Sequence, residues 1–156
     1  MTQINNYPLG RHDLCELLFL IIILGFFRRG QKDPSAKKVI ERKKELRKFV
    51  KQKQYDKVLK TGNEILEKNP HDHDVLFIVG GIYYMRNKLK TAISYFDRAL
   101  EIAEYDPQVL LLKANAHFRL SDISKSIQCC DKISEIDPKN KGVKELQEKI
   151  EHTKRA

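Results

Sequence analysis

The fold is decided by residues 76–100, which read LFIVGGIYYMRNKLKTAISYFDRAL. Two apolar segments with helical spacing flank a polar turn at Arg86–Asn87, as expected for two tightly joined helices. The pattern returns 34 residues earlier and 34 residues later without insertion or deletion. The equivalent positions are Leu46, Gly80 and Ala114; Phe49, Tyr83 and His117; Tyr55, Leu89 and Ile123; Val58, Ala92 and Ser126; Leu59, Ile93 and Ile127; and Ile65, Ala99 and Ile133. This constant period predicts an array of stacked helical hairpins, with Leu59, Ile93 and Ile127 packed inside it.

The composition favours an all-α fold. The chain has 156 residues, 41% of them hydrophobic and 33% charged, with only seven glycines and five prolines. Such a chain can bury the core of one domain and form long helices with short turns. Apolar residues recur at spacings of three and four, and no alternating strand pattern runs through the sequence. We therefore expect an all-α solenoid.

Turn and cap signals divide the chain into segments. We expect a tail at 1–13, a hydrophobic helix at 14–29, a linker at 30–36 and three hairpins at 37–70, 72–105 and 106–138. The tight turns within the hairpins are expected at Gln52–Lys53, Arg86–Asn87 and Leu120–Ser121. We expect residues 139–156 to form a last helix and a tail, with Val143, Leu146 and Ile150 on one face of that helix. One apolar stripe suits a cap that closes the open end of the array.

Residues 39–138 resemble the tetratricopeptide repeat. In the middle unit the family's positions fall on Leu76, Val79-Gly80, Tyr83, Ala92, Phe96 and Ala99. The third unit keeps the pattern with Leu110, Ala114, His117, Ser126, Cys130, Ile133 and Pro138, and the first unit is weaker. The resemblance implies a right-handed superhelix of three hairpins plus a C-terminal capping helix. In such an array the first helix of each hairpin lines a concave groove.

The resemblance also implies that this groove binds a peptide or a helix of another protein. By register its residues are Lys43, Arg47, Lys51, Phe77, Gly81, Tyr84, Met85, Leu111, Asn115, Phe118 and Arg119. A basic end and an apolar-aromatic remainder suit a ligand with hydrophobic anchors and acidic residues. The alternative is that these are ordinary exposed residues and that the partner binds elsewhere.

Some members of the family hold the C-terminal carboxylate of a chaperone in a clamp of Lys and Asn residues. Lys43 stands where such a clamp would begin. The sites of its other members hold Arg47, Ile78, Gln108 and Leu112. The sequence therefore does not support this clamp.

Residues 14–27 form a hydrophobic run with one acid, Glu16, near its start. As a helix the run would span about 21 Å, against about 30 Å for the hydrocarbon core of a bilayer. Five basic residues follow it and only Arg11 precedes it; the five are Arg28, Arg29, Lys32, Lys37 and Lys38. The positive-inside rule then predicts a single-pass anchor with a cytoplasmic repeat domain and these residues at the membrane surface. The alternative is a soluble adaptor or chaperone-like protein whose hydrophobic helix packs on the array or mediates oligomerisation.

The positive charge is concentrated in one stretch. The formal net charge is +9, and residues 28–69 contain 15 Lys and Arg against six Asp and Glu. Such a stretch can face anionic lipids, form an ordinary solvated helix face, or contact nucleic acid phosphates. Because interleaved aromatic residues and a nucleic-acid-binding motif are missing, we do not expect a nucleic acid partner.

Catalytic and metal-binding patterns are weak. No phosphate loop, nucleophile elbow, zinc-binding helix or Rossmann turn appears, so we expect a non-catalytic scaffold without a cofactor. His71 and His73 are two residues apart and would point to different sides of a helix, which argues against a metal site. We expect Asp72 to cap the helix that begins at His73. His117 and Cys130 occupy packing positions, and the three cysteines do not indicate a disulfide framework.

Overall fold

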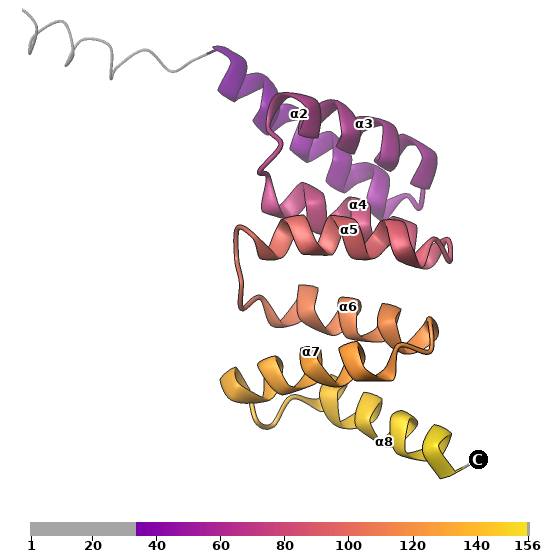
Figure 1. Cartoon of the computed structure of the whole chain (residues 1–156). Helices are drawn as coiled ribbons and strands as arrows, with labels where there is room; N and C mark the ends of the chain where they lie inside the picture. Colours follow the sequence, from indigo (N-terminus) through magenta and orange to yellow (C-terminus); the bar gives the residue numbers. More distant parts are fainter. Residues whose placement is uncertain (1–33, 156) are drawn as a thin grey trace, which may run out of the picture. The chain divides into compact units, whose positions relative to one another are not determined.

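A computed structural model describes residues 34–155, and all of its regular elements are α-helices. The helices are α2 (Pro34–Lys51), α3 (Tyr55–Lys68), α4 (His73–Met85), α5 (Leu89–Leu100), α6 (Pro107–Arg119), α7 (Ile123–Ile136) and α8 (Lys141–Arg155). The chain divides into two units, Met1–Val39 and Ile40–Ala156, and the packing below concerns the second. In that unit successive helices pair as α2–α3, α4–α5 and α6–α7, followed by α8 (Figure 1).

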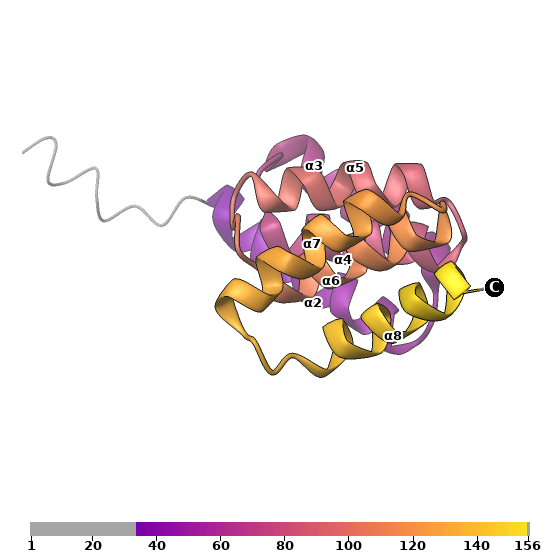
Figure 2. The same ribbon diagram turned by 60° about the horizontal axis from the view of Figure 1, so that its bottom comes forward.

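The hairpins stack in sequence order. From α3 onward each helix packs on the next one along the chain, and α4 also contacts α6, which in turn contacts α8. Viewed as in Figure 2, α3 and α5 lie on one side of the stack, whereas α2, α4, α6 and α8 lie toward the other. The first helices of the hairpins therefore form one layer, and the predicted all-α repeat architecture is confirmed for the described residues.

The turns inside the three hairpins have the same geometry. Lys53, Asn87 and Ser121, spaced 34 residues apart, all have a positive φ of 56°, 60° and 61°. The residue after each of them donates its N–H to a carbonyl five positions back, as in Gln54 to Phe49 at 3.0 Å. This is the hydrogen bond that closes a helix in the Schellman motif. Left-handed residues are therefore built into every hairpin at the predicted tight turn.

A glycine at one of these turns should stabilise the protein. Ser121 is exposed and has a φ of 61°, a conformation that is unfavourable for residues with a Cβ atom. We expect Ser121→Gly to raise the free energy of unfolding by up to about 1 kcal/mol. Urea denaturation followed by circular dichroism measures it. A loss of stability would mean that the seryl side chain itself supports the turn.

The first helices also begin in the same way. Asp72, Asp106 and Asn140 are 34 residues apart and cap α4, α6 and α8. The Asp72 carboxylate accepts the N–H of Val75 at 3.3 Å, that of Asp106 accepts Val109 at 3.1 Å, and the Asn140 carbonyl accepts Val143 at 3.2 Å. The predicted cap at Asp72 is thus confirmed, and α8 starts in register with the repeats.

Small residues sit where the two helices of a hairpin meet. A Cβ atom on Gly80 would lie 2.7 and 2.9 Å from two ring carbons of Phe96, so only glycine leaves room for that ring. Phe96, Ala92 and Ala99 of α5 are fully buried. The missing Cβ on α4 and the phenyl ring on α5 are complementary shapes, and they fix how closely the two helices approach.

The third hairpin and α8 share one apolar cluster. It contains Leu110, Ala114, Cys129, Cys130 and Ile133 of the hairpin and Val143, Leu146 and Ile150 of α8. The apolar stripe predicted for the last helix is therefore buried against the array. His117 and Cys130 are buried as expected.

Two details of the sequence prediction need correction. Leu59, Ile93 and Ile127 are only half-buried, and the fully buried row is their neighbour, Val58, Ala92 and Ser126. The 34-residue repeat shows which residues occupy equivalent positions. It does not show which set of equivalent residues points into the core. In addition, α2 begins at Pro34, so residues 34–36 of the expected linker are helical. Proline is well suited to a first helical turn, because its fixed φ matches the helix and its missing N–H is not needed there.

The predicted hydrophobic helix at 14–29 lies outside the described residues. Between residues 34 and 155, no helix is both long enough and apolar enough to cross a membrane.

Candidate functional site

The predicted groove residues lie on α2, α4 and α6, and we call the exposed surface of these three helices the α2–α4–α6 face. Equivalent positions along it are Arg47, Gly81 and Asn115, and Lys51, Met85 and Arg119. Arg47, Lys51, Met85 and Arg119 are exposed, with Met85 60% accessible. Phe77, Gly81, Tyr84, Leu111, Asn115 and Phe118 are half-buried. An apolar strip on α4 is thus bordered by cations on α2 and at the end of α6.

Lys43 is engaged inside the protein. Its Nζ lies 2.9 Å from Asp72 Oδ1 and 3.2 Å from Asp74 Oδ2, which joins α2 to the first turn of α4. Burial acts to lower the pKa of Lys43, but the hydrogen bonds to the two carboxylates outweigh it and raise the pKa above its usual value. The hydrogen bond from Lys43 likewise lowers the pKa of Asp74. This ammonium group therefore holds two hairpins together and already has two anionic partners.

Other cations of the α2–α4–α6 face are less committed. Lys44, Lys48 and Lys51 are exposed, and none of them forms an ion pair with a described residue. Arg47 reaches Asp74 at 3.3 Å, but both side chains are more than half exposed, so water screens this pair. Asp74 is the one acidic residue within α4, and α6 contains none. The face therefore carries an excess of accessible positive charge along α2.

At the other border, Arg119 is held in a defined position. Its guanidinium carbon lies 4.8 Å from the centre of the Tyr84 ring, and its Nη2 donates to Asn87 Oδ1 at 2.9 Å. These contacts join the end of α6 to the end of α4. A cation stacked on an aromatic ring keeps its charge while its conformation is restricted, so little entropy is lost when an anion binds it.

Leu111 and Phe118 pack against the cluster that α8 completes. A Cβ atom on Gly142 of α8 would collide with the Leu111 side chain, so α8 approaches this part of α6 closely. Both residues were predicted from their register to line the groove. The structure shows that they also support the last helix, which leaves the α4 residues as the more accessible apolar part of the face.

The predicted basic residues near the hydrophobic run are only partly described. Lys37 and Lys38 are exposed on α2. Arg28, Arg29 and Lys32 lie outside the described residues. Their assignment to a membrane surface stays a prediction.

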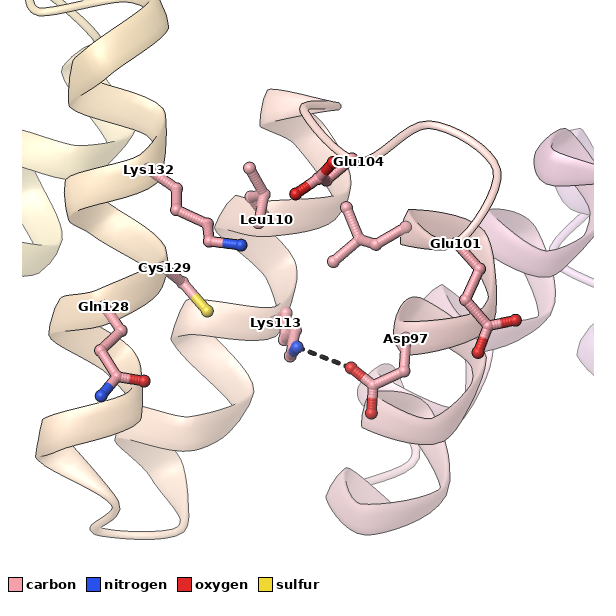
Figure 3. Close-up of a pocket in the computed structure, with 9 residues that line it drawn as sticks. Asp97, Glu101, Glu104, Leu110, Lys113, Gln128, Cys129 and Lys132 are labelled. Atoms are coloured by element: carbon pink, nitrogen blue, oxygen red, sulfur yellow. Dashed lines mark ion pairs between the residues drawn. The ribbon is translucent and has the colours of Figure 1, made fainter.

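A depression of about 370 Å³ lies between α5, α6 and α7 (Figure 3). Its lining places Asp97, Glu101 and Glu104 opposite Lys113 and Lys132, and the Lys113 Nζ lies 2.6 Å from Asp97 Oδ1. Cys129 also lines it, and burial raises the pKa of this thiol, which disfavours the nucleophilic thiolate. Carboxylates outnumber lysines three to two in this depression, and the Lys113–Asp97 contact is the one ion pair between its described lining residues.

The His71–Asp74 segment serves the packing of the hairpins. Asp72 caps α4 and binds Lys43, and its Oδ2 accepts from Asn69 at 3.3 Å. His73 lies 3.3 Å from the carboxylate of Asp106, the cap of the next first helix. Among the described residues, no three His, Cys, Asp or Glu side chains gather closely enough to hold a metal ion.

His117 is a buried histidine beside a carboxylate. It is 6% exposed, and its Nδ1 lies 3.5 Å from Asp122 Oδ2. Burial lowers the pKa of His117 below its usual value, and the nearby Lys113 and Lys125 act in the same direction, whereas Asp122 and Asp97 oppose them. The unfolded chain, with an ordinary histidine pKa of about 6.5, therefore binds a proton before the folded protein does.

We accordingly expect the protein to lose stability as the pH falls from about 6.5 toward the lowered pKa of folded His117. Thermal unfolding at about pH 7.5 and about pH 5.5 measures the loss. In His117→Gln the difference between the two pH values should shrink. An unchanged difference in this variant would assign the pH dependence to other groups.

The stacked hairpins have the architecture of tetratricopeptide repeats. Residues 83–150 match the tetratricopeptide repeat family. No curated protein sequence matches the chain. The resemblance to the tetratricopeptide repeat inferred from the sequence is thus confirmed over residues 83–150.

Solved tetratricopeptide domains have the same fold. The first such domain of Spaghetti (RPAP3), bound to an HSP90 peptide, is 18% identical, with 77% of this chain and 95% of that chain covered and a TM-score of 0.71. The Arabidopsis OM64 domain is 15% identical, with coverages of 74% and 95% and a TM-score of 0.68. The TPR2B domain of yeast Sti1, in complex with an Hsp70 peptide, is 15% identical, with coverages of 75% and 98% and a TM-score of 0.67. At these identities the likeness concerns the fold.

Proposed function

We propose that this protein is a non-catalytic adaptor that binds a segment of another protein in a concave groove along the α2–α4–α6 face. The observation that carries the proposal is the juxtaposition on one face of an apolar strip, Phe77, Tyr84 and Met85, with accessible cations on both borders. Tetratricopeptide repeats are protein-binding modules, which supports this proposal. A preformed surface binds by ordering its partner, so affinity comes from few, well-placed anchors.

The partner segment should be acidic and carry hydrophobic anchors. Spaghetti (RPAP3) and Sti1 domains bind HSP90 and Hsp70 peptides, and the RPAP3 peptides end in the acidic sequence EEVD. In this chain, however, Lys43 is paired with Asp72 and Asp74. Ile78, Gln108 and Leu112 occupy positions where the clamp of such domains needs Asn or a cation. We therefore propose an internal acidic segment as the ligand, one that does not depend on a terminal carboxylate.

Selection from a random peptide library on the full-length chain tests this proposal. We expect enrichment of acidic peptides with large apolar residues, and loss of their binding to Lys51→Glu/Met85→Ser, a double variant of two exposed residues. Lys90→Glu, an exposed residue of α5, is the matched control and should bind normally. Equal binding to all three proteins would refute the groove.

We further propose that residues 14–27 anchor the protein to a membrane, with the repeat domain in the cytoplasm. The support is the apolar run itself and the cluster of cations that follows it. Extraction of cell membranes with alkaline carbonate should leave the full-length protein in the pellet. Release into the supernatant would instead favour a soluble adaptor whose hydrophobic segment packs on protein.

A further inference from the structure

Two adjacent glycines in the middle of α4 have opposite surroundings. A Cβ atom on Gly80 would meet the Phe96 ring at 2.7 Å and Tyr95 Cβ at 3.1 Å. A Cβ atom on Gly81 would meet nothing within 4 Å. Gly80 is thus explained by packing within the protein, and Gly81 is not.

The backbone does not explain Gly81 either. No described glycine has a positive φ, so Gly81 adopts the ordinary helical conformation that alanine also adopts. A glycine inside a helix destabilises it relative to alanine, because the unfolded chain loses more conformational freedom. The chain therefore keeps an unfavourable residue at a position where an added methyl group would touch no other part of the protein.

The free space beside Gly81 lies on the surface proposed to bind the partner. Gly81 lies on the α2–α4–α6 face, at the position equivalent to Arg47 of α2 and Asn115 of α6. Along α4, one helical turn away in each direction, stand Phe77 and Met85, with Ile78 and Tyr84 also adjacent on the helix surface. Apolar side chains thus flank Gly81, where no side chain covers the helix backbone.

The neighbouring side chains give the chemistry of what would occupy this point. By register Arg47 is the equivalent residue of α2, and the exposed Lys51 follows it one helical turn later. Asn115, the equivalent residue of α6, uses its amide N–H₂ on the Leu111 carbonyl at 2.8 Å. Arg119 is stacked on Tyr84 at the end of the same face. Because cations predominate on both borders of the apolar strip, charge complementarity favours a partner segment in which acidic residues flank an apolar residue.

We propose that Gly81 is the residue that sets the specificity of this face: it admits a large apolar side chain from an acidic segment of another protein, which packs directly on the α4 backbone. This inference rests on the proposed adaptor function and names the contact at its centre. Glycine serves here because a ligand atom approaches the backbone where a Cβ atom would otherwise stand. Any larger residue would fill the space and displace the ligand's anchor.

The two glycines give a stability test with opposite expected signs. Gly81→Ala should raise the midpoint of thermal unfolding of the full-length chain by about 2–5 °C, because alanine favours the helix and meets no neighbour. Gly80→Ala, the matched control one residue away, should lower it, because the new methyl group collides with the buried Phe96 ring. A fall in the midpoint for Gly81→Ala would overturn the inference, since it would reveal a structural role for the glycine.

Binding is then measured with an acidic peptide enriched from a random library on the wild-type full-length chain. Gly81→Gln should lower the affinity for this peptide by about tenfold to thirtyfold, which is the loss expected when one central anchor no longer binds. Ser94→Gln, at an exposed position of α5, is the control and should leave the affinity unchanged. We also replace the largest apolar residue of the peptide by alanine. This change should weaken the peptide's binding to the wild-type protein by a similar factor, and its binding to the Gly81→Gln variant far less.

The outcomes separate this inference from the proposed function. If Lys51→Glu/Met85→Ser loses the peptide but Gly81→Gln retains it, the face binds and the role of Gly81 is refuted. If neither variant changes the affinity, the adaptor function on this face fails as well. Enrichment of uncharged apolar peptides similar to residues 14–27, or self-association that Gly81→Gln abolishes, would replace the acidic partner by this chain itself.

Discussion

Phe96→Ala should lower the free energy of unfolding by about 3–5 kcal/mol, the largest effect we expect from one substitution. The Phe96 side chain is 0% exposed and covers Gly80 on the facing helix. Truncation removes the buried ring and leaves a cavity that cannot close, because the glycine opposite it has no side chain to move in. Urea denaturation of the full-length chain measures the change through the shift of the midpoint at constant slope.

The double variant Phe96→Ala/Gly80→Ala tests this explanation. If the ring and the missing Cβ are complementary, alanine at 80 destabilises the wild type but should be tolerated, or should even help, once the ring is gone. The two changes would then be strongly non-additive, as expected for residues in contact. Additive effects would show that Gly80 and Phe96 do not form one packing unit. Ser94→Ala, exposed on the same helix, is the control and should change little.

Asp72→Ala should lower the free energy of unfolding by about 2–4 kcal/mol. The Asp72 side chain is 7% exposed and has two roles, since it caps α4 and accepts from Lys43 at 2.9 Å. Loss of the cap alone destabilises by about 1 kcal/mol. The remainder arises because the partly buried Lys43 ammonium keeps only the exposed Asp74 as a partner. Chemical denaturation monitored by circular dichroism gives the size of the effect.

Asp106→Ala is the matched control, because Asp106 caps α6 in the equivalent position. Asp106 accepts from the Gln108 and Val109 N–H groups but binds no lysine. Its removal should therefore cost a free energy of unfolding close to that of losing a helix cap alone. A cycle with Lys43→Met should show coupling between Lys43 and Asp72. An equal loss for Asp72→Ala and Asp106→Ala would contradict the structural role of the Lys43 bridge.

Much of the fold could be predicted because its turn and cap residues recur every 34 residues, which is also the length of one packed hairpin. The turns at Lys53, Asn87 and Ser121 and the cap at Asp72 depend on hydrogen bonds between residues at most five positions apart. Such contacts are encoded locally and can be inferred from residue type. The direction of a side chain relative to neighbouring helices is not local, and this is why Leu59 was expected in the core although Val58 occupies it.

The sequence predicts which residues share the α2–α4–α6 face, but it does not predict their contacts. Register alone places Arg47, Gly81 and Asn115 at equivalent positions. It cannot show that Lys43 pairs with Asp72, because that bond joins residues 29 positions apart across two hairpins. Nor could the sequence distinguish Gly80 from Gly81, since the difference lies in what a Cβ atom on each would meet.

Amide chemical-shift mapping by NMR tests the central claim, that an acidic protein segment binds the α2–α4–α6 face. The isotope-labelled full-length chain is titrated with an acidic peptide selected on it. We predict that the largest shifts occur at Arg47, Gly81 and Asn115 and their neighbours on these three helices, with Gly81 reporting directly through its own N–H. Shifts concentrated on α3, α5 and α7, with the Gly81 resonance unmoved, would contradict the account.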